Sequence, residues 1–249
     1  MLNDSEYKCF IIHLKRAKKR KTYVDKIISQ LSISSEIINA VDGKLLSDND
    51  ILKYSSSDPL FQPTYPFGLN NGEIGCFLSF RKAWKKIVDQ NLSAGLIFED
   101  DVSLNLDIFN KSLKSALKWI DEYGYIQFQV RDIPKKSILI KTENNVKLFQ
   151  PFPNLLRCSA QLVSYSTAVK LLKLTKVFDR PVDGFLQLEW NTHIKISTIT
   201  PSGVKDNTDA SGGSNLSIDM PFKRKIRNEW TRLKYRHQIK KYTNKYFKI

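Results

Sequence analysis

The sequence predicts an α/β fold, in which a mixed, mainly parallel sheet is flanked by helices. The chain begins in the order strand, helix, strand, which is typical of a parallel sheet. Its 249 residues are 41% hydrophobic and 11% aromatic, which suffices for a sizeable core and excludes a disordered protein. We therefore expect one α/β domain over residues 1–221 and a basic amphipathic tail over 222–249.

The first half of the chain supplies the clearest elements. Apolar runs rich in β-formers predict strands, and apolar residues at helical spacing predict helices. "NNGE" offers Asn70 as an N-cap with Glu73 three residues later, the pattern of a capping box. The expected elements are strands at 7–14, 36–43 and 93–98, and helices at 15–31, 47–54 and 70–89.

The second half continues this alternation with more turns. Ser166 can cap a helix that follows the strand beginning near Arg157. Gly, Ser, Asn and Asp concentrate in 201–219, which predicts a flexible loop. The other expected elements are a helix at 106–123, a strand at 124–130, a hairpin at 138–150, a short helix or turn at 181–190, and a strand at 192–200.

Three consecutive carboxylates, Glu99, Asp100 and Asp101, follow an apolar strand in "GLIFEDDVSL". Because adjacent carboxylates repel and burial opposes their ionisation, they need a compensating cation or exposure to water. In extended backbone Glu99 and Asp101 point to one side, at the edge where open α/β sheets bind ligands, and Asp100 points to the other. This pattern suits Mg²⁺ or Mn²⁺ completed by water and substrate phosphates. The alternative is that Asp100 or Asp101 only begins a loop or caps a helix.

The segment "NNGEIGCFLSFRKAWKKIVDQNLSAGLIFEDDVSL" resembles the central region of glycosyltransferase family 25. Bacterial members extend lipopolysaccharide or lipooligosaccharide and typically transfer galactose. "IIHLKRAKKR", "NAVDG" and "PVD" extend the resemblance, in order, over roughly residues 7 to 205. The chain departs from the family at Phe80, where a His is common, and in "RCSAQLVSYS", which predicts a differently shaped pocket wall.

The resemblance implies a GT-A type nucleotide-sugar fold, a divalent cation, and inverting transfer from a UDP-hexose to a glycan or lipid-linked oligosaccharide. In that scheme Asp101 is the main metal ligand. Glu99 contacts the metal-bound water or the ribose, and Asp100 supports the donor sugar.

Inverting transfer also needs a general base for the acceptor hydroxyl. Asp183 of "PVD" is the first candidate, and a turn residue after Pro181 is its alternative. Glu189 is the second candidate, or it contacts an acceptor that stacks on Trp190.

Seven further residues each have a functional and a structural interpretation. Glu73 could reach the donor or serve only in the capping box, and Asp42 and Gly43 could approach uridine or form a turn. His193 could be a late metal ligand or a surface imidazole. Basic side chains near the start could meet the nucleotide phosphates or form a solvated face: Lys15, Arg16 and Arg20.

The net charge of +15 lies mainly in the tail, where 222–249 hold eleven Lys or Arg and one acid. Four apolar residues there recur at helical spacing: Phe222, Ile226, Trp230 and Leu233. This spacing predicts a basic amphipathic helix on an anionic lipid surface. A solvated helix packed on the body is the alternative. The expected surface residues are Lys223, Arg224, Lys225, Arg227, Trp230 and Arg232.

The remaining sequence features limit location and function. "MLNDSEYK" is polar and "CFII" is too short for a signal peptide, so we expect a bacterial-type cytoplasmic protein, peripheral on the inner membrane. Three scattered cysteines, Cys9, Cys76 and Cys158, predict reduced thiols. No nucleic acid is expected, because the charge lies in the tail and no such motif occurs. A nucleic-acid-binding protein, a metal-dependent hydrolase and an inactive sugar-binding relative are the alternatives.

Overall fold

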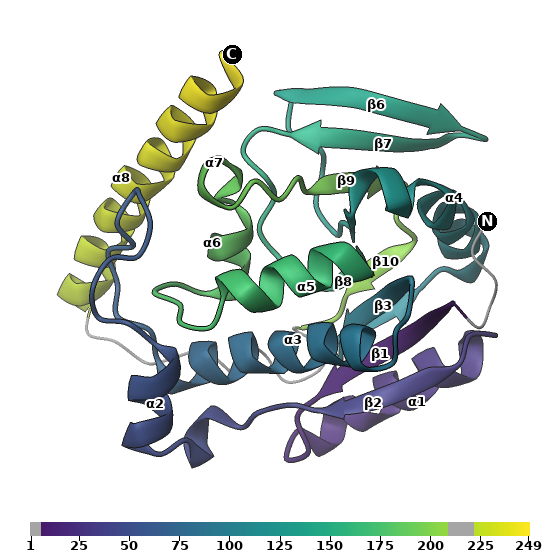
Figure 1. Cartoon of the computed structure of the whole chain (residues 1–249), viewed down its shortest axis with the longest axis horizontal. Coiled ribbons are helices and arrows are strands. Elements are labelled where there is room, and N and C mark those ends of the chain that lie inside the picture. Colours follow the sequence, from purple (N-terminus) through teal and green to yellow (C-terminus); the bar gives the residue numbers. More distant parts are fainter. Residues whose placement is uncertain (1–5, 209–221) are drawn as a thin grey trace.

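A computed structural model describes residues 6–208 and 222–249, with side chains from 228 onward in the last helix. Its main sheet has eight strands in the order β2-β1-β3-β8-β5-β9-β7-β6 (Figure 1). Only β8 and β7 run against the other strands of this sheet, so the predicted mixed, mainly parallel arrangement is confirmed. The strands are β1 (Tyr7–His13), β2 (Ser35–Asn39), β3 (Ala94–Glu99), β5 (Tyr125–Phe128), β6 (Ser137–Glu143), β7 (Val146–Pro151), β8 (Ala160–Ser164) and β9 (Ser197–Thr200).

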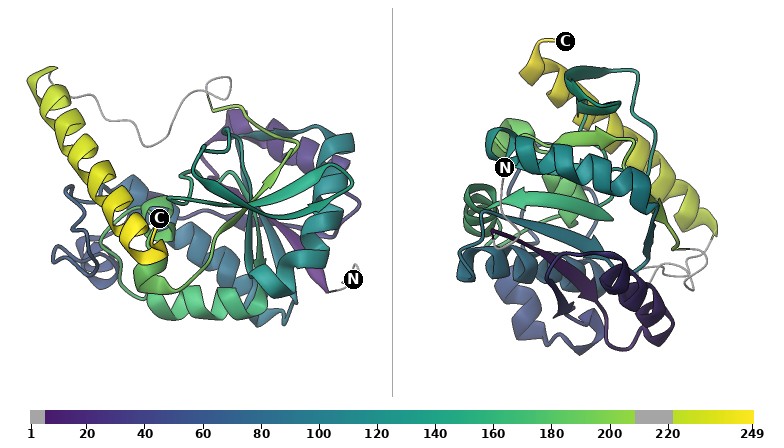
Figure 2. Two further views of the ribbon diagram at one scale, coloured as in Figure 1. Left: turned by 90° about the horizontal axis from the view of Figure 1, so that it is seen from above. Right: turned by 90° about the vertical axis from the view of Figure 1, so that its right-hand side faces the viewer.

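Helices cover both faces of the sheet. Alternation along β1 sends Cys9 and Ile11 into the core beneath α1 and α4, and Phe10 and Ile12 into the core beneath α3 and α5. Figures 1 and 2 show this three-layer arrangement, with α8 along one side of the body. The helices are α1 (Lys21–Gln30), α2 (Asp48–Tyr54), α3 (Asn71–Asp89), α4 (Leu106–Tyr123), α5 (Tyr165–Leu174), α6 (Val182–Leu186), α7 (Glu189–Thr192) and α8 (Phe222–Phe247).

The start of α3 is fixed by local sequence. Asn70 and Glu73 form the predicted capping box, in which each side chain accepts a hydrogen bond from the other residue's backbone N–H. Two glycines let the backbone after β2 touch this helix: a Cβ on Gly43 would lie 2.0 Å from the Asn71 carbonyl oxygen, and one on Gly75 would lie 2.6 Å from that of Val41. The glycines therefore bring these two backbone segments into direct contact.

The acidic segment turns instead of staying extended. β3 ends at Glu99, residues 100 and 101 form a turn, and β4 (Val102–Leu104) leaves to pair with β10 (Val204–Asp206). The expected alternation of side chains through Asp101 is therefore wrong. Residues 204–206, expected within a flexible loop, form a strand, and 209–219 of that loop lie outside the described residues.

Two smaller predictions in the second half are also wrong. Ser164 caps α5, in place of Ser166, because the strand ends one residue before the helix begins. β9 begins at Ser197, and His193 ends α7 in the left-handed conformation, with φ of 52°.

Helix α8 packs on the body through a stripe that the sequence analysis did not single out. Tyr235 and Ile239 are buried against Leu188, and the ring centroids of Phe247 and Phe152 lie 4.4 Å apart. The described part of the chain has no helix long and apolar enough to cross a membrane. Of the predicted surface residues, Trp230 is 65% exposed, whereas the side chains of Lys223, Arg224, Lys225 and Arg227 lie outside the described residues.

Candidate active site

A cavity of about 370 Å³ opens where β1 and β3 end, between the acidic turn, the start of α3 and the start of α6. This is the carboxyl edge of two parallel strands, the position where open α/β sheets bind ligands. Five carboxylates proposed from the sequence line it together with Gly43: Glu73, Glu99, Asp100, Asp101 and Asp183.

The protein supplies its own cation for two of these acids. Arg20 Nη1 lies 2.8 Å from Asp100 Oδ1 and 2.9 Å from Asp101 Oδ2. His13 Nδ1 lies 2.8 Å from Asp100 Oδ2, which also accepts a hydrogen bond from the Leu14 N–H. Asp100 uses both oxygens inside the protein, so it holds the turn in place and has the least capacity left for a ligand.

Glu99 is the uncompensated member of the triplet. Within the described part of the chain, its carboxylate makes no hydrogen bond or ion pair. Burial, followed by the charges of Asp101 and Asp100, raises its pKa to about 8. Burial also raises the pKa of Asp101, while Arg20 opposes the shift. A bound cation would favour the ionised form of both acids.

The donor set of Glu99 and Asp101 fits a hard divalent cation. Carboxylate oxygens are the ligands that Mg²⁺ and Mn²⁺ prefer. The residues that the structure describes contain no group of three His, Cys, Asp or Glu able to hold a metal ion. Water and substrate phosphates would therefore have to complete the coordination.

Asp183 joins this cavity to a second one. It lies in the first turn of α6 and accepts a hydrogen bond of 2.7 Å from the Gly184 N–H, and burial raises the pKa of its carboxyl group. It also lines a cleft of about 590 Å³ between α8, α6 and the 153–156 segment. Both hollows share Pro181.

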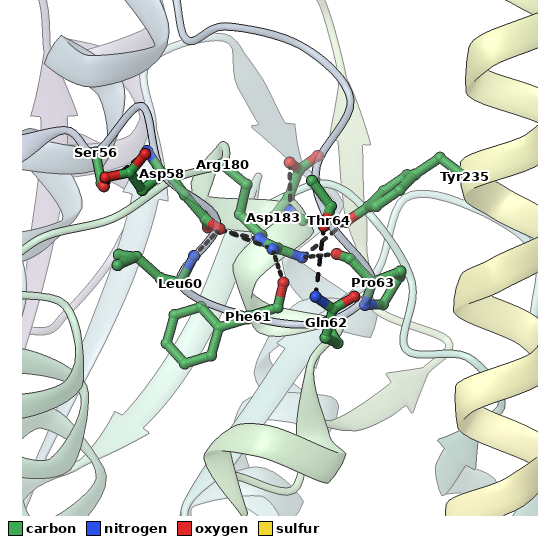
Figure 3. A network of polar contacts seen from close by, with 12 residues as sticks. Ser56, Asp58, Leu60, Phe61, Gln62, Pro63, Thr64, Arg180, Asp183 and Tyr235 are labelled. Atoms are coloured by element: carbon green, nitrogen blue, oxygen red, sulfur yellow. Dashed lines mark hydrogen bonds and ion pairs between the residues drawn. The ribbon is translucent and has the colours of Figure 1, made fainter.

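A buried arginine connects the Asp183 segment to α8 (Figure 3). Arg180 has no exposed side-chain surface and forms an ion pair with Asp179. Its guanidinium donates hydrogen bonds to the carbonyl oxygens of Phe61 and Pro63, at 2.9 and 3.1 Å, and to the Tyr235 hydroxyl at 3.0 Å. These contacts fix α8 and the loop around Pro63 next to Pro181 and Asp183, which line both hollows.

Glu189 and His193 are among the predicted site residues that do not line either hollow. Glu189 is buried and accepts a hydrogen bond from Gln150 Nε2, and burial raises its pKa to about 7. Glu189 lies outside both hollows, so its role as a base stays a prediction. His193 lies against Tyr246 of α8, and its carbonyl accepts a hydrogen bond from Lys170, which keeps it away from the acidic turn.

Asp42 does not line the acidic cavity, although its neighbour Gly43 does. It accepts hydrogen bonds from the Lys44 N–H and from Arg16 Nε, at 3.0 and 2.6 Å, and caps the short 3-10 helix that starts at Gly43. Gly43 itself lines the cavity, so the two halves of the predicted pair have different roles.

Arg157 is a cavity residue that the sequence analysis did not propose. It has a φ of 88°, its Nη1 lies 2.7 Å from Asp206 Oδ2, and its carbonyl oxygen accepts a hydrogen bond from Gln127 Nε2. Cys76 and Cys158 also line the cavity, and burial raises the pKa of both thiols well above the usual value. They are therefore neutral and not poised as nucleophiles. The sequence signal for the side of the cavity formed by Arg157 and Cys158 was the unusual "RCSAQ" segment.

Comparison with known proteins identifies the family of this chain. The family model described as "Glycosyltransferase family 25 (LPS biosynthesis protein)" matches residues 6–186. The chain therefore belongs to glycosyltransferase family 25.

Curated relatives include enzymes and a protein named as inactive. Human procollagen galactosyltransferase 2 is 30% identical over 194 residues, which cover 74% of this chain and 30% of the relative. Glycosyltransferase 25 family member from Drosophila melanogaster is 30% identical over 225 residues, which cover 84% of this chain and 34% of the relative. Inactive glycosyltransferase 25 family member 3 from Mus musculus is 34% identical over 112 residues, which cover 44% of this chain and 19% of the relative. The chain thus spans about a third of the length of the first two relatives.

Similarity to solved structures is low. A mannose-1-phosphate geranyltransferase from Thermus thermophilus is 8% identical with a TM-score of 0.42, over 78% of this chain and 73% of that one. A glycosyltransferase involved in glycosylation of the major capsid of PBCV-1 is 14% identical with a TM-score of 0.33, over 68% and 63%. Neither value supports an argument about function.

Proposed function

We propose that this chain is an inverting glycosyltransferase of the GT-A type, which moves a hexose from a UDP-sugar to a glycan or lipid-linked oligosaccharide. The observation that carries the proposal is that Asp183 lines both hollows. The donor would occupy the acidic cavity and the acceptor the cleft, so that their reacting atoms meet at this carboxylate. Galactose is the proposed hexose because curated relatives are named galactosyltransferases.

The carboxylates of Asp101 and Glu99 would hold Mn²⁺ or Mg²⁺ against the donor diphosphate. When bound, the ion neutralises charge that develops on the leaving diphosphate. Arg20 keeps Asp100 and Asp101 in the turn, and the close contact between Gly43 and α3 shapes the opposite wall. These residues therefore orient the donor without reacting with it.

Asp183 would act as the general base. It takes the proton of the acceptor hydroxyl while the hydroxyl oxygen bonds to the anomeric carbon, and the bond between that carbon and the diphosphate oxygen breaks on the opposite face. The products are the glycoside with inverted configuration and UDP. Burial raises the pKa of Asp183, which makes its ionised form a stronger base.

The proposed acceptor and location follow from the family and the tail. The family description names LPS biosynthesis, so lipopolysaccharide or lipooligosaccharide is the proposed acceptor class. The exposed Trp230 and the excess of cations in α8 support attachment to the anionic cytoplasmic face of an inner membrane. Trp230→Ser should then lower co-sedimentation with phosphatidylglycerol vesicles, and unchanged binding would contradict this attachment.

A panel of UDP-sugars, assayed for UDP release with Mn²⁺ and with EDTA, tests the activity. Release that requires an acceptor supports a transferase, release into water indicates a hydrolase, and donor binding without release indicates an inactive relative. Asp101→Ala should abolish Mn²⁺-dependent turnover, while Asp107→Ala on the exposed start of α4 serves as the control. Full Mn²⁺-dependent turnover by Asp101→Ala would overturn the metal assignment.

A further inference from the structure

The cleft beside α8 has an excess of positive charge. Arg131, Arg232, Arg236 and Lys240 line it, together with His237. Among its lining residues that the structure describes, Asp183 is the only acid. A cleft built for a neutral sugar would have no need of four cationic side chains.

The cations of α8 are held at the cleft by the packing of the helix. Arg232, Arg236 and Lys240 follow one another at intervals of four residues and so share one helix face. Tyr235 and Ile239, between them in sequence, are buried against the body and fix the rotation of the helix. Two exposed lysines of the same helix, Lys234 and Lys241, do not line the cleft.

Among the residues that the structure describes, most of these cations have no ion-pair or hydrogen-bond partner. Arg232 forms an ion pair with Glu229 and lies over the ring of Phe67, with 5.8 Å between its guanidinium carbon and the ring centroid. The side chains of Arg131, Arg236 and Lys240 make no ion pair or hydrogen bond within the described residues. These side chains can therefore bind an anion, although the charge of Arg131 also acts on the carboxylates of Asp183 and Asp206. Arginine pairs well with both phosphate and carboxylate.

The other lining groups suit a saccharide. The rings of Tyr65 and Phe67 line the cleft with their centroids 5.6 Å apart, and they offer apolar surface for a sugar ring. Asn154 and Gln187 also line the cleft, where their amide groups are fixed by hydrogen bonds within the protein, from Asn154 Nδ2 to the Leu186 carbonyl and from Gln187 Nε2 to the Asn154 carbonyl. The cleft is concave and ends at the proposed base, which favours a ligand that enters it over a flat lipid surface.

We propose that the cleft binds an acidic saccharide acceptor, in which a phosphate or carboxylate substituent contacts Arg131, Arg236 and Lys240 while a hydroxyl faces Asp183. This inference rests on the proposed transferase function and names the acceptor class of the same site. It also explains why the positive side of α8 is directed into the cleft and not only outward.

Isothermal titration of the full chain, with UDP and Mn²⁺ present, tests the inference with three probes: lactose, lactose 6′-phosphate and 3′-sialyllactose. At least one acidic probe should bind ten times more tightly than lactose, and its affinity should fall as salt rises. The double variant Arg236→Ala/Lys240→Ala should lose at least fivefold in that affinity. The matched variant Lys234→Ala/Lys241→Ala removes the same charge from α8 and should keep it, with both melting temperatures recorded as a check on folding.

The outcomes separate the inference from the function on which it rests. Equal affinity for all three probes, no binding of any probe, or an equal loss in both double variants overturns the acidic-acceptor inference. Tight phosphate binding without sialyllactose binding restricts the class to phosphorylated sugars. Binding of UDP-galactose to the wild-type chain is measured separately, and its absence overturns the proposed function itself.

Discussion

The acidic cavity and the cleft beside α8 meet at Asp183, yet their charges are balanced in opposite ways. In the cavity, Arg20 lies within 3 Å of two carboxylates, and only Glu99 is left without a polar partner in the described part of the chain. In the cleft, cations outnumber the one acid. The acidic cavity therefore suits a cation and a diphosphate together, whereas the cleft beside α8 suits an anion alone.

The two hollows also differ in how the chain builds them. The cavity lies at the end of adjacent parallel strands, where a fold of this kind places ligands by default. The cleft depends on α8, which is held by apolar packing of Tyr235 and Ile239 and by the hydrogen bond from the buried Arg180 to the Tyr235 hydroxyl. Variants can therefore disturb one hollow without the other.

Asp183→Asn should have the largest effect of the four substitutions, a loss of kcat, because Asp183 is the proposed base and lines both hollows. Loss of a general base lowers kcat by about 10³-fold, because the amide cannot take the acceptor proton. Donor affinity should change by less than about threefold, because the amide keeps the shape of the carboxylate. Steady-state UDP release and donor titration measure both quantities, with Asp121→Asn on the exposed face of α4 as the control. A variant with more than a tenth of the wild-type kcat would remove Asp183 from the role of base.

Arg20→Met should destabilise the cavity by breaking its internal charge balance. Asp100 and Asp101 would remain buried without their cation, which costs about 3 kcal/mol in the free energy of unfolding. Urea denaturation measures this loss, and Lys19→Met, an exposed neighbour, should cost less than about 0.5 kcal/mol.

A double variant tests whether the loss is electrostatic. Arg20→Met/Asp100→Asn removes one of the two stranded charges, so it should be more stable than Arg20→Met alone. If the double variant is instead less stable than Arg20→Met alone, Arg20 supports the turn by packing and not by charge.

Glu189→Gln should distinguish a buried structural acid from a catalytic one. Burial raises the pKa of Glu189 from 4.5 to about 7, so between these values the folded chain keeps a proton that the unfolded chain releases. Wild-type stability therefore falls as pH rises through this window, by up to about 1.4 kcal/mol per pH unit. The glutamine variant lacks this dependence.

Measured from pH 5 to pH 8, Glu189→Gln should gain about 2 kcal/mol in unfolding free energy relative to the wild type. The exposed control Asp121→Asn should show no such gain. kcat should fall far less than in Asp183→Asn, because Glu189 lines neither hollow. A loss of kcat as large as that of Asp183→Asn would support Glu189 as a base.

Local signals explain what the sequence could predict. Helix α4 occupies the expected 106–123, and the capping box at Asn70 forms as proposed, because both depend on residues within a few positions of each other. The cavity carboxylates were found because strand ends converge in a parallel sheet. That the acidic segment turns after Glu99 could not be predicted, since the turn is held by Arg20, about 80 positions earlier in the chain.

The cleft was beyond sequence analysis for a related reason. The apolar stripe expected in the tail included Trp230 and Leu233, which are exposed, whereas Tyr235 and Ile239 face the body. Periodicity shows that such a helix has an apolar side, but the contact that selects the side is the hydroxyl of Tyr235 with Arg180. Alternation misplaced His193 because the strand does not begin until Ser197.

Tyr235→Phe should loosen this contact and give the smallest of the four effects. Arg180 Nη1 loses its hydrogen bond to the hydroxyl, which costs about 1.5 kcal/mol for a buried charged donor. Because Arg180 also bonds the loop around Pro63 and its ion pair with Asp179 remains, the body should stay folded.

The useful measurement for Tyr235→Phe is the ratio of KM for the acceptor to KM for the UDP-sugar. A looser α8 displaces cleft cations, so KM for the acceptor should rise several-fold, while KM for the UDP-sugar should stay unchanged because none of the described side chains of α8 lines the acidic cavity. Tyr242→Phe on the same helix keeps its ring contact with Trp190, whose centroid is 5.7 Å away, and is the matched control. Equal rises in both constants would mean that Tyr235 supports the whole fold, and that the two hollows are not independent.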